Sequence, residues 1–541
     1  MPEHAPSEPA LSEHAPEPEA REFALAFRGF LDWVYSTDDG GGRRDVPDLI
    51  AGFLGAGGAE HSVVTRGLPP FEHVNLQTAL DAWSARPERT VRVQGVTIPP
   101  HHGGLSLQQL VSAAALPPLR LSAPALIDLP NGPGSALGCL KLALLLVSDE
   151  QGRYVIMVQG PGEHHPGLEV EVAGLPLDAA QRLLAELDRL RSELNVYRGH
   201  QLDVSLDQMG GVTLGFATPP GLVRDDVVLP EATLARIERH ALGVAAHRDA
   251  LLAAGQHLKR GLLLYGPPGT GKTHSVRYLL GQMPGYTRLV LTGRALVAVG
   301  GVTELARDLQ PAVVVLEDVD LVAQDRSMGP GSSPVLFDLL DAMDGAASDA
   351  DLLFLLTTNR ADILETALAA RPGRVDVAVE IALPDAAARE RLLALYGRGV
   401  PLALTPEDVA AAVERTDGTT ASFLKELIRR SVLEALHDSA ALSGDTPLPG
   451  DTPLPGDTPL PGHTPPPGPA ALPAVTGAHV SRALDDLLDA AQAVTRTLLG
   501  VGVDAADLPV GGLPAGALMA HRRATARASG ARGQGAFFFG G

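Results

Sequence analysis

Strongly apolar segments alternate with helical patterning between residues 261 and 359. The apolar segments are GLLLYG, TRLVLTG, AVVVLED and DLLFLLTTN. Strands that are apolar on both faces, with helices between them, are typical of a parallel sheet covered on both sides. From residue 385 the pattern is helical only, as in DAAARERLLALYG, TPEDVAAAVERT and SFLKELIRRSVLEALH. The pattern therefore predicts an α/β domain followed by a helical unit.

The region from Glu22 to Thr218 has a mixed α and β pattern. FALAFRGFLDWVY predicts an amphipathic helix, RTVRVQGVTI a strand, and GRYVIMVQG and GLEVEVAGL two paired strands around the loop PGEHHPG. LDAAQRLLAELDRLRSELNV has leucines at helical spacing. This region contains no motif of known chemistry, so we expect an α+β domain whose role is to recognise a partner.

Two stretches have compositions that do not favour packing into a core. Residues 1–20 repeat EHAP, are acidic and rich in proline, and are expected to be disordered. DTPLPG occurs at 445–450, 451–456 and 457–462, and HTPPPG follows at 463–468. Prolines at this density exclude helix and sheet and favour an extended tether. HVSRALDDLLDAAQAVTRTLL then predicts a further helix, and the Gly/Ala-rich end of the chain is expected to be disordered.

Together these patterns divide the chain. We predict a disordered acidic tail (1–20), an α+β domain (21–220), an α/β domain (221–384), a helical unit (385–500) interrupted by the proline-rich repeat (443–475), and a disordered C-terminal tail (501–541).

Composition narrows the choice of partner and compartment. The formal net charge of −21 argues against a protein that coats nucleic acid, because phosphate neutralisation needs clustered Lys and Arg. The single cysteine, Cys139, excludes an intramolecular disulfide and a multi-cysteine zinc site, and is expected to be buried. No stretch of 18 uncharged apolar residues occurs, and residues 1–20 lack the pattern of a secretory signal. We therefore expect a cytoplasmic protein without a membrane partner.

The segment GPPGTGKT, at 266–273, follows the apolar run GLLLY and precedes a helical pattern. It satisfies the phosphate-loop pattern G-x-x-x-x-G-K-[ST] in the strand–loop–helix context that the pattern requires. Its glycines let backbone N–H groups converge on phosphate at the positive end of the next helix. Lys272 is expected to reach the β- and γ-phosphates, and the Thr273 hydroxyl to bind Mg²⁺. The predicted phosphate-binding residues are Gly266, Pro267, Pro268, Gly269, Thr270, Gly271, Lys272 and Thr273.

Polar residues follow two of the predicted strands. AVVVL ends in Glu317 and Asp318, with Asp320 two positions on, and carboxylates at this edge of a parallel sheet can hold Mg²⁺ and polarise a water. The alternative is an ordinary acidic turn. Asn359, after the strand DLLFLLTT, can orient the attacking water, or can simply favour a turn.

The sequence Arg371-Pro372-Gly373-Arg374 comes a dozen residues after that strand. Two arginines on a rigid turn suit contact with a γ-phosphate, in the same subunit or in a neighbouring one. The alternative is that both side chains are solvated at the surface.

Five segments in this order and spacing, GPPGTGKT, VVVLEDVD, LLDAMDG, LLTTNRADIL and ALAARPGRVD, resemble an ATPase of the AAA family. The similarity covers roughly residues 225–441 and 477–495. It implies an αβα P-loop NTPase domain with a helical lid, usually in a hexameric ring with ATP between subunits. The α+β domain would precede this core.

The resemblance also assigns roles by position. It makes Gly266 to Thr273 Walker A, Glu317 and Asp318 Walker B, and Asn359 sensor 1, with Mg²⁺ held by Thr273 and Glu317. Arg371 and Arg374 match arginine fingers that enter the next subunit's site. TDGTTASFLKEL resembles the lid segment that closes over the base, with Gly418 and Ala421 nearest the nucleotide, and the proline-rich repeat is then an insertion in the lid.

The chain departs from the family pattern in two places. Most members have Asp-Glu where this chain has Glu317-Asp318, an order that resembles the branch of mitochondrial respiratory-complex assembly factors. We therefore expect hydrolysis to survive, with Asp318 in the water-polarising role, and its side chain, one methylene shorter, can slow the reaction. The substrate-gripping pore loop usually carries an aromatic residue, whereas Leu296–Gly301 has none, and a smaller side chain grips less apolar area.

The zinc-protease motif H-E-x-x-H does not occur, and the pairs His101-His102 and His164-His165 lie in Pro/Gly-rich loops, where we expect surface histidines. This excludes an ATPase fused to a protease of that type. The leading hypothesis is an ATPase that remodels a protein partner as a ring. The alternatives are a slowly hydrolysing ATP-dependent switch or scaffold, a small-molecule phosphotransferase, and a nucleic-acid remodeller, the last disfavoured by the acidic charge.

Overall fold

The computed structural model describes residues 46–58, 61–98, 105–112, 119–162, 165–208, 210–320, 350–360, 375–443 and 472–489, together with Glu22, Phe23, Ala26, Phe27 and Phe30. The chain divides into two compact units, Met1–Thr218 and Pro219–Gly541. Both tails, the proline-rich repeat and the segment with Arg371 and Arg374 lie outside the described residues, so the predictions made for them stay predictions. No helix in the described part of the chain has the length and apolar character that crossing a membrane requires.

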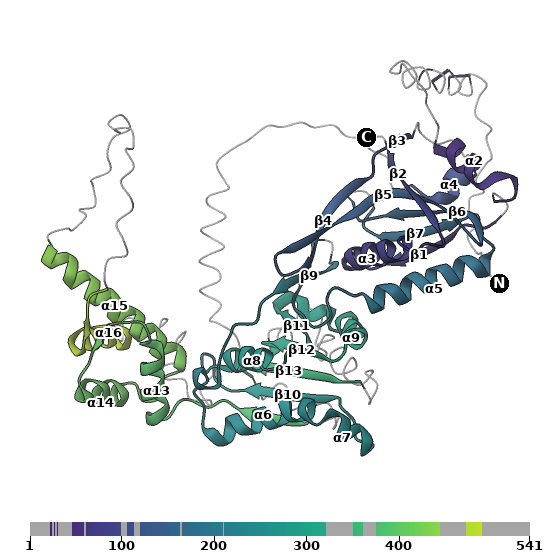
Figure 1. Cartoon of the computed structure of the whole chain (residues 1–541). Coiled ribbons are helices and arrows are strands. Elements are labelled where there is room, and N and C mark those ends of the chain that lie inside the picture. The colour runs from purple at the N-terminus through teal and green to yellow at the C-terminus, as the bar shows by residue number, and fades with distance from the viewer. Residues whose placement is uncertain are drawn as a thin grey trace, which may run out of the picture. The chain divides into compact units, whose positions relative to one another are not determined.

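The first unit is built on an antiparallel sheet (Figure 1). The strand order is β1-β7-β6-β5-β2-β3, and β4 pairs with the first half of β5. The strands are β1 Val64–Leu68, β2 Thr90–Thr97, β3 Arg120–Ser122, β4 Ala125–Gly132, β5 Ser135–Asp149, β6 Gly152–Gln159 and β7 Leu168–Ala173, and β8 Gln201–Leu206 pairs with β9 Val212–Ala217 as a hairpin. The helices are α2 Val46–Gly58, η1 Pro70–Glu72, α3 His73–Ser84, α4 Leu107–Val111 and α5 Leu177–Glu193.

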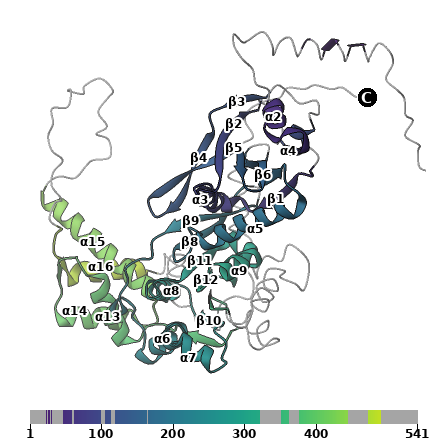
Figure 2. The ribbon, with the colours of Figure 1, turned by 45° about the vertical axis from the view of Figure 1, so that its right-hand side comes forward.

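Alternate residues of β5 and β6 serve different cores, because successive side chains of a strand point to opposite faces. Leu145 and Ile156 pack with residues of α3 and α5, whereas Leu144 and Met157 pack with residues of α2 and α4. The unit therefore has helices on both faces of its sheet, and the predicted α+β class is confirmed. Both ribbon views show α3 and α5 side by side (Figures 1 and 2).

The apolar run around Cys139 forms part of the long strand β5, which the pattern did not predict as a strand. Cys139 is fully buried, as predicted. Burial raises the pKa of its thiol to about 11, and the charges of Asp81 and Asp128 act in the same direction. The side chain therefore behaves as a small buried hydrophobe.

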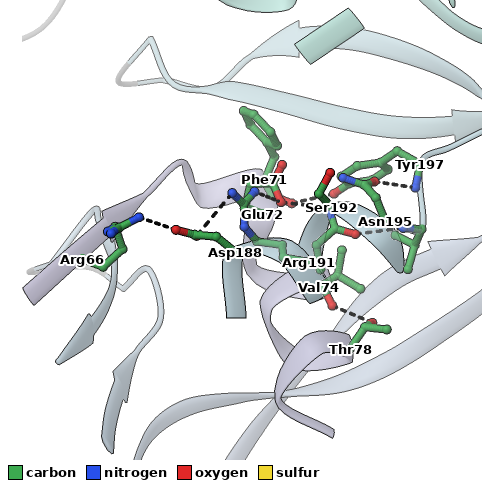
Figure 3. A network of polar contacts seen from close by, with 12 residues as sticks. Arg66, Phe71, Glu72, Val74, Thr78, Asp188, Arg191, Ser192, Asn195 and Tyr197 are labelled. Carbon is green, nitrogen blue, oxygen red and sulfur yellow. Dashed lines mark hydrogen bonds and ion pairs between the residues drawn. The ribbon is translucent and has the colours of Figure 1, made fainter. Parts of the chain in front are cut away.

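A network of charged and polar contacts joins β1, α3 and α5 (Figure 3). The carboxylate of Glu72, which is 4% exposed, accepts from Asn75 at 3.0 Å and lies 2.7 Å from a guanidinium nitrogen of Arg191. Arg191 also lies 3.6 Å from Asp188, which pairs with Arg66 of β1. Because a buried carboxylate needs a partner, Glu72 depends on Arg191 of α5.

The second unit is built on the predicted parallel sheet, with the strand order β14-β10-β13-β12-β11. The strands are β10 Arg260–Tyr265, β11 Thr287–Thr292, β12 Ala312–Glu317, β13 Leu352–Thr358 and β14 Val377–Glu380. The helices are η2 Arg224–Asp226, α6 Glu231–Ala246, α7 Arg248–Ala253, α8 Lys272–Gly281, η3 Gly293–Ala298 and α9 Val299–Asp308.

Helices cover both faces of this sheet. Leu262 and Val313 share a core with residues of α6 and α8, whereas α9 packs against β11 and β12. Strands β10, β12 and β13 are buried at nearly every position, which explains why their sequences are mainly apolar and do not alternate. The predicted αβα fold is therefore confirmed.

The remaining helices, α13 Ala386–Tyr396, α14 Pro406–Arg415, α15 Ala421–Ser443 and α16 Gly477–Leu488, form a bundle with its own core (Figures 1 and 2). Short strands β15 Leu402–Ala403 and β16 Val475–Thr476 pair beside them. Of the helix predicted over 479–499, the part up to Leu488 is confirmed as α16, and residues 490–499 lie outside the described residues. Val480, Leu484 and Leu487 pack α16 into the core of the bundle, and helices of this length depend on such packing.

The replacement Glu72→Ala tests the network of Figure 3. It leaves the guanidinium of Arg191, whose side chain is 22% exposed, without its closest carboxylate, and is expected to lower the free energy of unfolding by about 3 kcal/mol. The measurement is urea unfolding followed by tryptophan fluorescence, since Trp33 and Trp83 both belong to the first unit. Asp178→Ala, which breaks an exposed pair with Arg182, is the matched control and is expected to leave the midpoint unchanged.

Candidate functional site

The loop between β10 and α8 has the backbone conformation of a phosphate cradle. Gly266 and Gly271 have φ angles of 141° and 106°, which side chains rarely allow. A Cβ on Gly266 would lie 2.3 Å from the carbonyl oxygen of Ile381, so this position also needs glycine because the neighbouring chain approaches so closely. The loop leads directly into α8, whose first N–H groups have no partners within the helix and point toward the loop.

Lys272 is the first residue of α8, and its side chain folds over the loop. Its ammonium group donates to the carbonyl oxygens of Gly266 and Pro267, both at 2.8 Å, and the residue is 6% exposed. Burial lowers the pKa of Lys272 to about 8, while the carboxylates of Asp318 and Asp320 act in the opposite direction. A phosphate group in the loop would favour the charged ammonium, because opposite charges at short range stabilise each other.

Asp318 follows the last residue of β12, Glu317, and has a φ of 52°, in the left-handed region that Asp tolerates better than most residues. Two hydrogen bonds to the end of β13 hold this turn. The backbone N–H of Asp318 donates to Oγ1 of Thr357 at 2.9 Å, and that of Val319 donates to the carbonyl oxygen of Thr357 at 3.0 Å.

Asn359 lies opposite Asp318, directly after β13. Its Nδ2 is 3.5 Å from Oδ1 of Asp318, at the long limit of a hydrogen bond. The pKa of Asp318 is raised by burial and then by the charge of Asp320, and is opposed by Lys272 and Asn359. A carboxyl group with a raised pKa is better matched to accepting a proton near neutral pH.

A cavity of about 230 Å³ adjoins the loop at Thr270. Its walls are mainly apolar and come from the segment before α6, the end of β14 with the following turn, and the start of α13. They include Val228, Leu229, Pro230, Ile381, Ala382, Leu383, Pro384, Ala388, Leu392 and Ala421. The sequence offered no motif for this cavity, because its wall residues come from segments about 150 positions apart. Of the residues that line the cavity, Thr270 and Ala421 had been predicted as site residues.

The start of α15 lies directly against the loop. The backbone N–H of Ser422 donates to the carbonyl oxygen of Gly269 at 3.1 Å, so the helical unit contacts the phosphate cradle through its backbone. The prediction placed Gly418 and Ala421 nearest the nucleotide. Ala421 lines the cavity, whereas Gly418, with a φ of 70°, is not among the described residues that line it.

The other predicted site residues are placed as follows. Thr273 lies in the first turn of α8, and Glu317 ends β12, so both lie at the edge of the sheet that carries Asp318 and Asn359. Within the segment that matches the pore loop, Val297 is 59% exposed, whereas Leu296 and Val299 are buried. Arg371 and Arg374 fall outside the described residues, so their role stays a prediction.

Residues 262–383 match the model of the ATPase family associated with various cellular activities (AAA). The chain carries an AAA ATPase domain. The match contains the cradle, Asp318 and Asn359, and agrees with the αβα fold.

Curated relatives of the AAA domain include proteins named ATP-dependent zinc metalloprotease FtsH. The chain is 34% identical to the one from Thermus thermophilus over 197 residues, which are 34% of this chain and 31% of the relative. It is 35% identical over 208 residues to FtsH 2 of Symbiobacterium thermophilum, covering 35% and 34% of the two chains. It is 32% identical over 204 residues to FtsH of Mycobacterium tuberculosis, which covers 35% of this chain and 26% of that relative. The chain thus spans about a third or less of the length of these relatives.

The residues of the AAA domain fit ATP and Mg²⁺, the ligands that the family uses. The cradle offers N–H groups and one ammonium for phosphate, and the Thr273 hydroxyl and the Glu317 carboxylate would supply oxygen ligands of the kind that Mg²⁺ prefers. Within the described residues no group of three or more His, Cys, Asp or Glu side chains is arranged to hold a metal ion by itself. Mg²⁺ commonly binds through one or two side chains together with phosphate and water, which agrees with this finding.

The replacement Lys272→Ala tests the cradle. It removes the buried ammonium that the carbonyl oxygens of Gly266 and Pro267 hold over the loop, and is expected to weaken binding of a fluorescent ATP analogue about 100-fold or more. Lys425→Ala, which removes an exposed lysine from α15, is the charge-matched control and is expected to bind as the wild type does. Equal affinity for the wild type and Lys272→Ala would contradict the assignment.

Proposed function

We propose that this chain hydrolyses ATP and uses the energy to remodel a protein partner. The observation that carries the proposal is the convergence of three side chains on one sheet edge. The ammonium of Lys272 lies over the cradle, and the carboxylate of Asp318 and the amide of Asn359 lie opposite each other at the ends of neighbouring strands. A phosphate-binding cation beside a carboxylate and an amide is the arrangement that phosphoryl transfer to water requires.

Each group has a part in the reaction. The cradle and Lys272 hold the phosphates, and Thr273 and Glu317 hold Mg²⁺, which neutralises charge on the phosphates when bound. Asp318 accepts a proton from the attacking water, for which its raised pKa is suited, and Asn359 orients that water. The turn that carries Asp318 is fixed by hydrogen bonds to Thr357, so the carboxylate needs little rearrangement.

The cavity beside Thr270 is the proposed site for the adenine base. Most of its wall residues are apolar, it adjoins the cradle, and Ala421 of the helical unit closes one side. A base bound there would contact both the sheet domain and the helical unit. Binding and release of nucleotide would therefore change how α15 lies on the cradle, through the hydrogen bond from Ser422 to Gly269.

We also propose that the chain assembles into a ring and acts on a protein partner. AAA domains typically act in oligomeric rings on protein substrates, and Arg371 and Arg374 match the residues that reach into a neighbour's site. The relatives are named as ATP-dependent zinc metalloproteases, and we carry over ATP dependence alone, because H-E-x-x-H does not occur in this sequence. The partner is proposed to be a protein bound by the first unit. A cytoplasmic location stays a prediction from the sequence.

A slowly hydrolysing switch or scaffold is the second candidate, favoured by two observations. Asp318 is shorter than the glutamate that most family members have at this position. The most exposed apolar residue of the matching pore segment is Val297, which offers a partner little area to hold. Steady-state ATP hydrolysis with and without candidate protein substrates separates the two, since a remodelling ATPase is stimulated by its substrate.

Mixing two inactive variants tests whether sites are shared between subunits. Lys272→Ala removes the cradle cation, and Arg374→Ala spares nucleotide binding but removes the predicted finger. Each variant alone is expected to hydrolyse ATP at less than about 1% of the wild-type rate, because each lacks a group needed in every site. In an equimolar mixture, about a quarter of the sites would combine an intact cradle with an intact finger from the neighbour, and hydrolysis should return to that level.

Two controls make the result decisive. Size-exclusion chromatography must show that the variants assemble as the wild type does, and a mixture of Lys272→Ala with wild type measures simple dilution. No recovery in the mixture, with both variants assembled, would contradict a site completed by the neighbouring subunit. A wild type with no measurable hydrolysis at saturating ATP and Mg²⁺ would contradict the proposed activity itself.

A further inference from the structure

Asp320 is a buried carboxylate beside the proposed active site that takes no part in the chemistry assigned above. It lies two residues after Asp318 and is 4% exposed. A buried carboxylate is unfavourable unless hydrogen bonds or opposite charges compensate it, so its partners show what holds it there.

Among the described residues, Asp320 accepts hydrogen bonds from Thr358 and Asn359, which both belong to the neighbouring strand end. The hydroxyl of Thr358 donates to Oδ1 of Asp320 at 2.9 Å, and the backbone N–H of Asn359 donates to the same oxygen at 3.1 Å. The Thr358 hydroxyl also accepts from the backbone N–H of Arg360 at 2.9 Å. One carboxylate oxygen and one hydroxyl thus determine the backbone of the turn that carries Asn359.

The turn that carries Asp318 is held by hydrogen bonds whose donors lie after β12 and whose acceptors lie on β13. There the donors are the N–H groups of Asp318 and Val319, and Thr357 supplies both acceptors. The turn after β12 and the turn after β13 are therefore held to each other from both sides. Asp318 and Asn359 lie one on each turn, so these bonds set the distance between them.

That distance matters because the contact between the two side chains is itself weak. Nδ2 of Asn359 is 3.5 Å from Oδ1 of Asp318, too long to hold either group in place. Catalytic groups need positions fixed to within about 0.5 Å, and supporting hydrogen bonds usually provide this. The supporting bonds here come from Asp320 and from Thr357.

We propose that Asp320 is a positioning residue, which acts through the Thr358 hydroxyl and the Asn359 backbone N–H to hold the sensor amide at the correct distance from the water-polarising carboxylate of Asp318. This inference rests on the proposed ATP hydrolysis and deepens it. Asp320 touches neither nucleotide nor water in this account. Its loss affects the rate of the chemical step and leaves nucleotide affinity nearly unchanged.

The competing explanation is that Asp320 only stabilises the fold. Asp351 is an example of a buried carboxylate with such a structural role. Asp351 is 1% exposed at the opposite end of β13, where it pairs with Arg260 at 3.1 Å and accepts from the Tyr286 hydroxyl at 3.0 Å. It is a buried carboxylate next to the same strand, remote from the cradle. Asp351→Asn therefore serves as the matched control for a purely structural effect.

The experiment compares variants of the full chain in which the bridging hydroxyl is lost or kept. Thr358→Val has nearly the same shape and cannot donate to Asp320, whereas Thr358→Ser keeps the donor. For each, kcat and KM for ATP and the dissociation constant of a fluorescent ATP analogue are measured. Thr358→Val is expected to lower kcat about 10- to 100-fold with KM and the dissociation constant changed less than about 3-fold, and Thr358→Ser to stay within about 3-fold of the wild type.

A second pair of variants guards against misfolding. Asp320→Asn keeps a carbonyl oxygen that can accept both bonds and is expected to retain most of kcat, whereas Asp320→Ala is expected to lose it as Thr358→Val does. Asp351→Asn is expected to lower the unfolding midpoint while kcat stays within about 3-fold of the wild type. Circular dichroism confirms that each variant is folded at the assay temperature.

The outcomes separate this inference from the function on which it rests. Wild-type kcat in Thr358→Val, or a Thr358→Ser as slow as Thr358→Val, would overturn the positioning role while the ATPase stands. A parallel loss of kcat in Asp351→Asn and Asp320→Asn, each with a lowered midpoint, would reduce Asp320 to a structural residue. A wild type without hydrolysis would overturn the proposed activity and this role with it.

Discussion

The arrangement of the second unit depends on the requirement to hold negative charge at the turn between β10 and α8. A phosphate chain repels itself and is strongly hydrated, so a protein must offer many aligned donors and a cation in return. Two glycines with positive φ turn the backbone, and the start of α8 adds its unpartnered N–H groups. The ammonium of Lys272 is kept over the loop by two backbone carbonyl oxygens. The sheet, the helical layers and the lid contact are all placed with respect to this turn.

The parallel sheet places the carboxylate of Asp318 and the amide of Asn359 at the sheet edge that also carries the phosphate loop. Because neighbouring parallel strands end at one edge, Asp318 and Asn359 meet although they are 41 positions apart in sequence. Hydrogen bonds between the two turns then refine what the topology has brought together. Parallel strands place these groups within a few ångströms, and Thr357, Thr358 and Asp320 supply the finer adjustment.

Local patterns predicted much of this architecture, and long-range contacts explain what they missed. The segment GPPGTGKT is contiguous and carries its own chemistry, and the strands around it are apolar because both of their faces are covered. By contrast, the cavity wall combines Val228 with Ile381, and no spacing within either segment indicates that they meet. The left-handed conformation of Asp318 arises from bonds to Thr357 on another strand. In the first unit, β4 and β5 were missed because their residues do not alternate between apolar and polar.

In the helical bundle, α15, α16, β15 and β16 hold together the two ends of the chain segment between α15 and β16. The length of that segment can therefore vary. The chain leaves at the end of α15 and returns at β16, which pairs with β15, while α16 packs along α15 and buries the same core. The contacts that hold these four elements together are made by residues of the elements themselves. Closing a loop twice as long costs only about 0.6 kcal/mol more in chain entropy. By this measure one hexapeptide unit more or less costs the bundle little stability, so the closure of the bundle tolerates changes in repeat number.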